Sequence, residues 1–211
     1  MSSTADAPLL RARGLECVRG GRRLFSGISF DLAGGGLLQV RGANGSGKTS
    51  LLRIVCGLLP PDGGDISWNA RAVRELGEEY RANLAYIGHL NSIKEELDPS
   101  ENLRYAASIA GLSATTAEID DALHSFGLAG AGLPCKLLSQ GQKRRAALAR
   151  LKLSGTRPLW VLDEPFSALD AKGVAVTRSL IEAHLAAGAT VIFTTHQEVA
   201  FGGRTIQSIE F

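Results

Sequence analysis

The sequence predicts an α/β fold in which a mainly helical segment is inserted into a parallel β-sheet. Three observations support this. An apolar segment at 37–41 leads through a glycine-rich turn into a stretch long enough to be a helix. The region from about 90 to 155 has a mainly helical pattern. Two apolar runs at 159–162 and 190–195 then read as strands buried on both faces, with a helix expected between them at 174–185. This order is typical of an α/β core that carries an inserted subdomain.

The helices have local start and stop signals. The first helix is expected to end near Leu59, because the prolines and glycines that follow cannot continue it. Asp98 is expected to cap the first helix of the insertion, with Glu101 completing a capping box. One apolar stripe defines a further helix and consists of Ile119, Leu123 and Phe126.

Length and composition restrict the possible function. A chain of 211 residues is long enough for one domain, so residues 1–211 are expected to form a single domain. With 23 basic and 21 acidic residues, the net charge of +2 gives no reason to expect a nucleic-acid partner. The basic residues are scattered except at 143–145.

Neither an export signal nor a membrane span is expected. The sequence has no basic start followed by an apolar stretch, and no run of about 18 apolar residues. Any membrane-spanning part is therefore expected on another chain, and this chain is expected to stay in the cytosol, free or docked. Three separated cysteines, Cys17, Cys56 and Cys135, form no metal-binding pattern and read as small core or surface residues.

A phosphate-binding loop is the strongest motif. Residues 42–49 fit GxxxxGK[ST] and lie between an expected strand and an expected helix, as this motif requires. Its backbone amides would converge on phosphate oxygens, Lys48 would reach the β- and γ-phosphates, and Thr49 would hold Mg²⁺. A plain glycine-rich turn is the alternative, and a dinucleotide-binding GxGxxG fits less well because Ser50 replaces its third glycine. The loop consists of Gly42, Ala43, Asn44, Gly45, Ser46, Gly47, Lys48 and Thr49.

Polar residues follow both later strands. Asp163 is expected to hold Mg²⁺, and Glu164 to orient and polarise an attacking water. His196 follows the last strand, where a neutral imidazole could contact the γ-phosphate or the water. Alone, the acidic pair would more often be a solvated turn and the histidine structural, but the phosphate loop favours the functional interpretation. Of the other histidines, His124 and His184 fall inside expected helices and read as surface residues.

A second anion site is expected at the start of the helix 143–153. Ser139 can cap this helix and Gly141 leaves room for a phosphate. The segment resembles the LSGGQ signature of ABC ATPases, with Gln140 in the third position and Gln142 in the last. The other motifs then match as well: the Walker A loop at 42–49, Walker B at 159–164, the D-loop at 167–170, and His196 in the H-loop.

The resemblance implies more than the motifs. It implies the P-loop NTPase fold of ABC ATPases, with an N-terminal antiparallel β subdomain and a helical subdomain at about 90–155 that carries the signature. It further implies ATP and Mg²⁺ as cofactors. Each ATP would lie in a head-to-tail homodimer, between the Walker A loop of one copy and the signature of the other.

Two positions differ from the general ABC pattern. His89 stands where most members have the Q-loop glutamine. A neutral histidine can make the same polar contacts, but a protonated one would repel Mg²⁺, so ATPase activity is expected to fall on mild acidification. Arg19 lies near the position where many relatives stack an aromatic ring on adenine, and its guanidinium could stack there instead.

Several short segments of the sequence are similar to those of the ABC ATPases of cytochrome c biogenesis, which also have a histidine in the Q-loop. The matching segments are 22–25, 28–30, 87–89, 101–103, 157–165 and 194–197. This resemblance implies integral-membrane partners of a haem-handling complex, at the cytoplasmic face of the bacterial inner membrane. The chain itself is not expected to bind haem, since it has no CxxCH. Alternatives are the ATPase of a lipid, drug or small-solute transporter, and a regulatory module that binds ATP without turnover.

Overall fold

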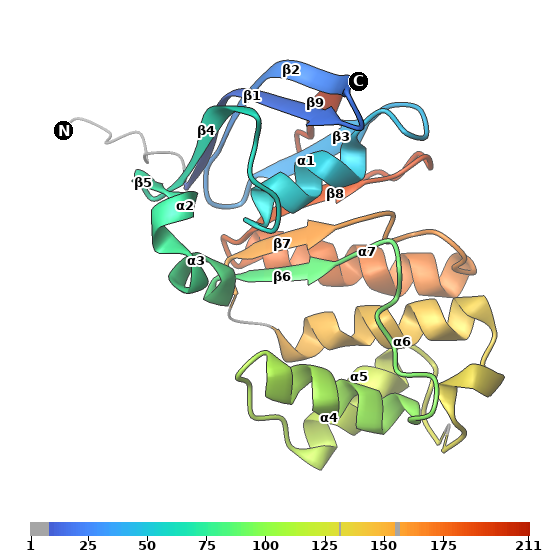
Figure 1. Cartoon of the computed structure of the whole chain (residues 1–211). Helices are drawn as coiled ribbons and strands as arrows, with labels where there is room; N and C mark the ends of the chain where they lie inside the picture. The colour runs from blue at the N-terminus through green and yellow to red at the C-terminus, as the bar shows by residue number, and fades with distance from the viewer. Residues whose placement is uncertain (1–8, 131, 155–156) are drawn as a thin grey trace. The chain divides into compact units, whose positions relative to one another are not determined.

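A computed structural model describes residues 9–130, 132–154 and 157–211, which divide into two compact units (Figure 1). The first unit comprises residues up to Tyr86 together with 157–163 and 184–211. The second comprises 87–156 and 164–183, so it includes most of the segment in which a helical insertion is expected. Gly155, at the end of that expected segment, lies outside the described residues.

Two sheets form the first unit. One is four-stranded in the order β2-β1-β4-β5, with neighbouring strands antiparallel, as the ABC resemblance implied for the N-terminal part. The other has five strands in the order β6-β7-β8-β3-β9, in which β7, β8, β3 and β9 pair in parallel. The strands are β1 (Leu10–Arg19), β2 (Arg22–Leu32), β3 (Leu37–Arg41), β4 (Gly63–Trp68), β5 (Arg71–Ala72), β6 (Leu84–Ile87), β7 (Leu159–Leu162), β8 (Thr190–Thr194) and β9 (Gln207–Glu210).

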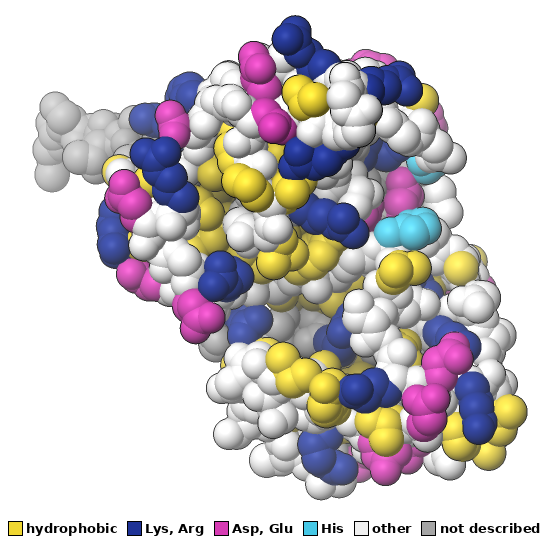
Figure 2. Space-filling model, in the orientation of Figure 1, with side chains coloured by type: hydrophobic (Ala, Val, Ile, Leu, Met, Phe, Trp, Pro, Cys, Tyr) yellow, Lys and Arg dark blue, Asp and Glu magenta, His cyan; other side chains and the backbone are white. Residues whose placement is uncertain are grey.

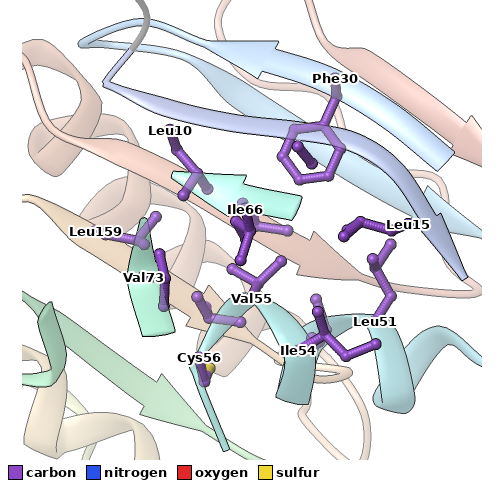
Figure 3. Close-up of a cluster of buried hydrophobic side chains, with 14 of the residues drawn as sticks. Leu10, Leu15, Phe30, Leu51, Ile54, Val55, Cys56, Ile66, Val73 and Leu159 are labelled. Atoms are coloured by element: carbon purple, nitrogen blue, oxygen red, sulfur yellow. The ribbon is translucent and has the colours of Figure 1, made fainter. Parts of the chain in front are cut away.

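The helix α1 (Lys48–Val55) lies between these two sheets and joins them through one hydrophobic core (Figure 1). Leu51 and Val55 are fully buried, and Leu15 of β1 and Leu159 of β7 belong to the same cluster (Figure 3). Burying such side chains contributes about 1.5–3 kcal/mol each. The start of α1, where the phosphate loop ends, is thereby held against the parallel sheet. The short helices α2 (Val73–Leu76) and α3 (Glu78–Ala82) complete this part of the unit.

Helices dominate the second unit (Figure 1). Asp98 and Glu101 form the expected capping box at the start of α4, and Thr115 with Glu118 forms another at α5. Ile119, Leu123 and Phe126 are all buried, as their common stripe predicted. The elements are α4 (Pro99–Ile109), α5 (Thr116–Ser125), the 3₁₀ turn η1 (Cys135–Leu137), α6 (Gln140–Leu153) and α7 (Ala171–Ala186), of which residues 171–183 belong here.

Helix boundaries are the main differences from the expected fold. The helix α1 ends at Val55 rather than near Leu59, because a Schellman motif closes it before the prolines are reached. In that motif the amide of Leu58 donates to the carbonyl of Arg53, and the amide of Gly57 donates to that of Ile54, both at 2.9 Å. Helix α6 begins at Gln140, directly after its Ser139 cap, and α7 begins at Ala171.

The three cysteines are all buried and free, so of the two expected placements, core or surface, all three take the core. Within the described parts of the chain, no helix has the length and apolar character that crossing a membrane requires. Acidic and basic side chains are interspersed over the face shown in Figure 2, as the small net charge suggests.

The expectation that His184 is a surface residue is wrong. Its side chain is only 7% exposed, and its ring stacks on that of Trp160 at 3.6 Å between centroids. His184 lies on the same face of α7 as Ile181 and Thr177, which are fully buried. Burial lowers the pKa of His184 to about 4, because the charged imidazolium loses solvation there. The other helical histidine, His124, is exposed as expected.

We expect His184 to make the fold sensitive to acid. The unfolded chain takes up this proton first, with an unperturbed pKa near 6.5, so stability is complete above that pH and declines as the pH falls toward 4. Between pH 7 and 5 this loss amounts to about 2 kcal/mol. His184→Phe keeps the stack on Trp160 and removes the proton, so urea unfolding should show a shallower loss for this variant than for the parent. His124→Phe is the exposed control, and equal pH dependence for parent and His184→Phe would contradict the prediction.

Candidate functional site

Three neighbouring strands of the parallel sheet end at the candidate site. The phosphate loop follows β3, Asp163 follows β7, and His196 follows β8 by two positions. Since β7, β8 and β3 are adjacent and parallel, their carboxyl ends meet at one edge of the sheet, where α/β proteins bind ligands. All of these residues belong to the first unit.

Just before α1 begins, the phosphate loop has a position that accommodates only glycine well. Gly47, the N-cap of α1, has φ +115°, and a Cβ there would lie 3.0 Å from the ring of Phe25 and 3.2 Å from Leu24. The end of the loop therefore packs closely against Leu24 and Phe25 of β2 at the start of the helix. Backbone amides at a helix start, backed by the positive end of the helix dipole, form an anion-binding site.

The helix termini differ in a way that matches this interpretation. The helices α4 and α5 carry Glu101 and Glu118 in their first turns, which compensate the positive helix end. The first turns of α1 and α6 contain no acidic residue. Helix α7 has no acidic residue there either. Helices α1 and α6 follow the phosphate loop and the signature segment, so both predicted anion sites keep a positive helix terminus.

Lys48 is buried inside the loop, although its side chain carries a charge. Its Nζ donates to the carbonyl oxygens of Gly42 at 2.7 Å and Ala43 at 3.0 Å. These bonds fold the lysine back along the loop and hold its ammonium where the loop amides converge. A phosphate oxygen is a stronger acceptor for this group than a neutral carbonyl.

Asp163 lies between two threonine hydroxyls. Thr49 Oγ1 donates to Asp163 Oδ2 and Thr194 Oγ1 donates to Asp163 Oδ1, each at 2.8 Å. The carboxylate is 2% exposed. This charge affects two neighbouring groups. Burial raises the pKa of the Cys56 thiol and of the Tyr86 hydroxyl, and the negative charge of Asp163 raises both further. A buried carboxylate beside a threonine hydroxyl is a suitable environment for a divalent cation.

His196 contacts the phosphate loop from the end of β8. Its Nε2 lies 3.0 Å from Asn44 Oδ1 and 3.5 Å from Lys48 Nζ. A bond to the amide oxygen of Asn44 requires the proton on Nε2, and the approach of Lys48 is then a contact rather than a hydrogen bond. The imidazole and the lysine thus lie at the same end of the loop.

The remaining predicted residues belong to the second unit. Ser139 Oγ accepts from the amide of Gln142, whose Oε1 accepts from the amide of Ser139, so the signature forms a capping box. This bond pattern leaves the first-turn amides of Gln140 and Gly141 without intrahelical partners. Gly141 has a packing reason as well, because a Cβ there would lie 2.7 Å from the carbonyl oxygen of Ala168.

Glu164 is held in the second unit with an unusual backbone. It is half-buried and has φ +52°, a value uncommon for a residue with a side chain. His89 is exposed and makes no hydrogen bond or ion pair with any of the described residues. Arg19 lies in the first unit, where it donates to the carbonyl of Val18 at 2.6 Å and pairs with Asp62 at 3.2 Å.

Sequence reasoning missed two residues that the structure connects to the site. Thr194 reads in the sequence only as part of a strand, because β-branched residues are expected in any strand. In the sequence Arg144 reads only as part of the basic run 143–145, yet it is 2% exposed. It shares the buried stripe of Leu148 and Leu151, at i+4 and i+7, which could have indicated its burial.

Comparison with known proteins agrees with this fold. The family model described as ABC transporter matches residues 25–167. The cytochrome c biogenesis ATP-binding export protein CcmA of Dechloromonas aromatica (strain RCB) is 52% identical over 202 residues, covering 95% of this chain and 98% of that protein. A solved ATP-binding subunit of an ABC transporter has a TM-score of 0.78 at 29% identity, covering 89% and 79% of the two chains. A dimeric ATP-binding cassette in a post-hydrolysis state, bound to ADP and phosphate, shares the fold with a TM-score of 0.77 at 21% identity, covering 89% and 88%.

The parallel sheet, the phosphate loop and the buried aspartate at the sheet edge are those of an ATP-binding cassette, and the chain is an ABC transporter ATPase. Such a protein binds and hydrolyses ATP. Within this class, the chain belongs to the family of cytochrome c biogenesis ATP-binding export proteins.

Proposed function

We propose that the chain is the ATP-hydrolysing subunit of a transporter complex for cytochrome c biogenesis, which couples hydrolysis to haem export or to release of a haem-loaded chaperone. The observation that carries the ATPase part is the convergence of Lys48, Thr49 and Asp163 at one edge of the parallel sheet. The relatives named for cytochrome c biogenesis, which match nearly the whole chain, support the cellular role.

The phosphate loop would bind the triphosphate of ATP. Its residues 42–49 supply the converging amides, and Lys48 would exchange its bonds to the carbonyls of Gly42 and Ala43 for bonds to the β- and γ-phosphates. His196, already bonded to Asn44 in this loop, would contact the γ-phosphate from the end of β8. Arg19 would contribute a guanidinium to adenine stacking, with Asp62 orienting it.

The residues fit Mg²⁺. This cation prefers hard oxygen ligands and usually takes only one or two carboxylates together with substrate phosphates and water. Thr49 Oγ1 and Asp163 Oδ2 are such oxygens and already lie 2.8 Å apart. Mg²⁺ bound there with ATP would neutralise charge that develops on the phosphates. Thr194 holds the second carboxylate oxygen, which would keep Asp163 oriented toward the metal.

Glu164 would orient and polarise the attacking water, because it directly follows the metal-binding aspartate in the chain and carries the carboxylate that proton transfer needs. The signature residues 139–142 would serve the other copy of a head-to-tail homodimer. There the free amides at the start of α6, with no acidic residue in its first turn, would meet the γ-phosphate bound by the partner.

His89 gives the proposed site a pH dependence. In the Q-loop position that the ABC resemblance assigns to His89, a neutral histidine would contact polar groups of the nucleotide site, whereas a protonated one would repel Mg²⁺. We expect ATPase activity to fall on mild acidification, and the fall to be smaller for His89→Gln. The measurement is a pH profile of kcat at saturating Mg²⁺ and ATP, with the exposed His124→Gln as control. Superimposable profiles for parent and His89→Gln would exclude this role.

In this cellular role the chain would be a peripheral subunit on integral-membrane partners, at the cytoplasmic face of a bacterial inner membrane. The test is complementation in a bacterium whose own cytochrome c biogenesis ATPase gene has been deleted. We expect the parent chain to restore covalently haem-bearing cytochromes, detected by haem staining, and Glu164→Gln to fail at equal expression. Restoration by both chains would show that hydrolysis is not needed. Restoration by neither, with an active purified ATPase, would favour another transport substrate.

A further inference from the structure

Arg144 is a buried arginine that joins separate segments of the second unit. One terminal nitrogen, Nη1, donates to the carbonyl of Gly88 at 2.9 Å and to Asn91 Oδ1 at 3.2 Å. The other, Nη2, donates to the carbonyl of Glu164 at 2.9 Å. The side chain extends from the first turns of α6, close to the signature, so one planar group connects three sequence regions.

Its contact with Glu164 falls on a strained residue. Glu164 has φ +52° and precedes Pro165, in a backbone region that is unfavourable for a residue with a side chain. Such a conformation persists only where the surroundings specify it. The Glu164 carbonyl accepts three bonds: from the amide of Ser167 at 3.1 Å, from Ser167 Oγ at 3.0 Å and from Arg144.

Of these three donors, Arg144 is the one that comes from outside the turn. The two bonds from Ser167 close the turn 164–167 on itself, whereas the guanidinium fixes that turn relative to α6. A charged donor also makes a stronger bond to the carbonyl than the neutral groups do. The direction of the Glu164 side chain therefore depends on Arg144.

The other half of the guanidinium holds the chain on both sides of His89. Arg144 Nη1 bonds to the two residues that flank this segment, the carbonyl of Gly88 and the side chain of Asn91. His89 itself remains exposed between these anchors. The anchoring bonds leave its imidazole available while they fix its backbone.

We propose that Arg144 is a positioning residue for ATP hydrolysis, which sets Glu164 and the segment around His89 in one geometry relative to the signature helix. The proposal rests on the water-orienting role proposed for Glu164. Arg144 acts through the carbonyls of Glu164 and Gly88 and needs no contact with ATP. It should thus affect the rate of the chemical step more than the binding of nucleotide.

The test compares Arg144→Lys with Arg150→Lys in the full chain. Lysine keeps the charge but cannot make the two-pronged contact. Arg150 is the matched control, because it lies on the same helix and donates to the carbonyls of Asn91 and Ala147, but among the described residues it bonds to neither Glu164 nor Gly88. We expect Arg144→Lys to lower kcat by about 10- to 100-fold, as displacement of a reacting group by about 1 Å does. KM and the ATP dissociation constant should stay within about twofold, and Arg150→Lys should change kcat by less than about threefold.

Thermal unfolding, followed in parallel, separates positioning from packing. An unchanged kcat in Arg144→Lys overturns the proposal. An equal loss of kcat in both lysine variants, or a loss that appears in ATP binding instead, also overturns it, since general packing of α6 would then explain the effect. If Arg144→Lys fails to fold, Ser167→Ala removes a donor from the same carbonyl. That variant should lower kcat at unchanged KM, and an unchanged kcat would contradict the proposal.

Glu164→Gln, measured alongside, distinguishes this proposal from the function on which it rests. Normal turnover in Glu164→Gln would remove Glu164 from its proposed role. Loss of turnover in Glu164→Gln together with full activity in Arg144→Lys would refute the role of Arg144 alone.

Discussion

Replacing Glu164 by glutamine is expected to lower the rate of ATP hydrolysis by about 10²- to 10⁴-fold, the usual contribution of a positioned acid or base. The amide has nearly the same shape as the carboxylate but cannot accept a proton from water. ATP binding should remain, because the phosphate loop is unchanged. Phosphate release and equilibrium binding of ATP measure the two effects separately. Glu182→Gln is the control, since Glu182 lies on α7 in a weak pair with Arg178. Turnover within threefold of the parent would contradict the assignment.

The same variant should also reveal the homodimer. If ATP lies between two copies, blocking hydrolysis leaves the dimer assembled, and sedimentation should show dimer with Mg²⁺ and ATP and monomer without them. Adding Gln140→Glu to this variant is a sharp test. A glutamate in the first turn of α6 favours the helix, yet it would repel the phosphates of the partner's ATP. The double variant should stay folded and monomeric. An undiminished dimer would show that the signature does not face the ATP bound by the partner.

Replacing Lys48 by methionine is expected to weaken ATP binding by about 10- to 100-fold, since a hydrogen bond to a charged group contributes about 1.5–3 kcal/mol. Methionine fills a similar volume but cannot bond to the phosphates or to the carbonyls of Gly42 and Ala43. Titration with a fluorescent ATP analogue measures the change. Lys172→Met, at an exposed position on α7, is the control. Equal affinity of Lys48→Met and the parent would exclude the proposed position of ATP.

The sequence predicted the parts of the site that depend on local patterns. The phosphate loop is one continuous motif, and Asp163 and His196 follow from the rule that parallel strands present ligand-binding residues at their carboxyl ends. Contacts between distant segments were not predictable in the same way. Thr194 has the β-branched side chain expected of any strand, so its bond to Asp163 could not be distinguished from ordinary strand propensity.

Buried polar side chains account for the other differences. Arg144 and His184 belong to residue types that usually lie at the surface, and each is buried because of its place on a helix. The helical spacing of Arg144 from Leu148, and of His184 from Ile181, indicates that these side chains are buried, although residue type alone argues against burial. The N-terminal antiparallel strands were expected only from the resemblance to ABC ATPases. The end of α1 was misplaced because a glycine closed the helix before the prolines.

The start of α1, which has no acidic residue in its first turn, lowers the stability of the protein when no nucleotide is bound. Lys48 places a positive charge at the first position of this helix, where the dipole disfavours a cation, and the side chain is 8% exposed. A binding site that attracts a triphosphate is thus a source of repulsion when no phosphate is present. ATP removes that repulsion and so stabilises the folded chain by mass action. Resistance to heat in this protein therefore depends on nucleotide concentration, and the residues that give it activity are among those that limit its stability when ATP is absent.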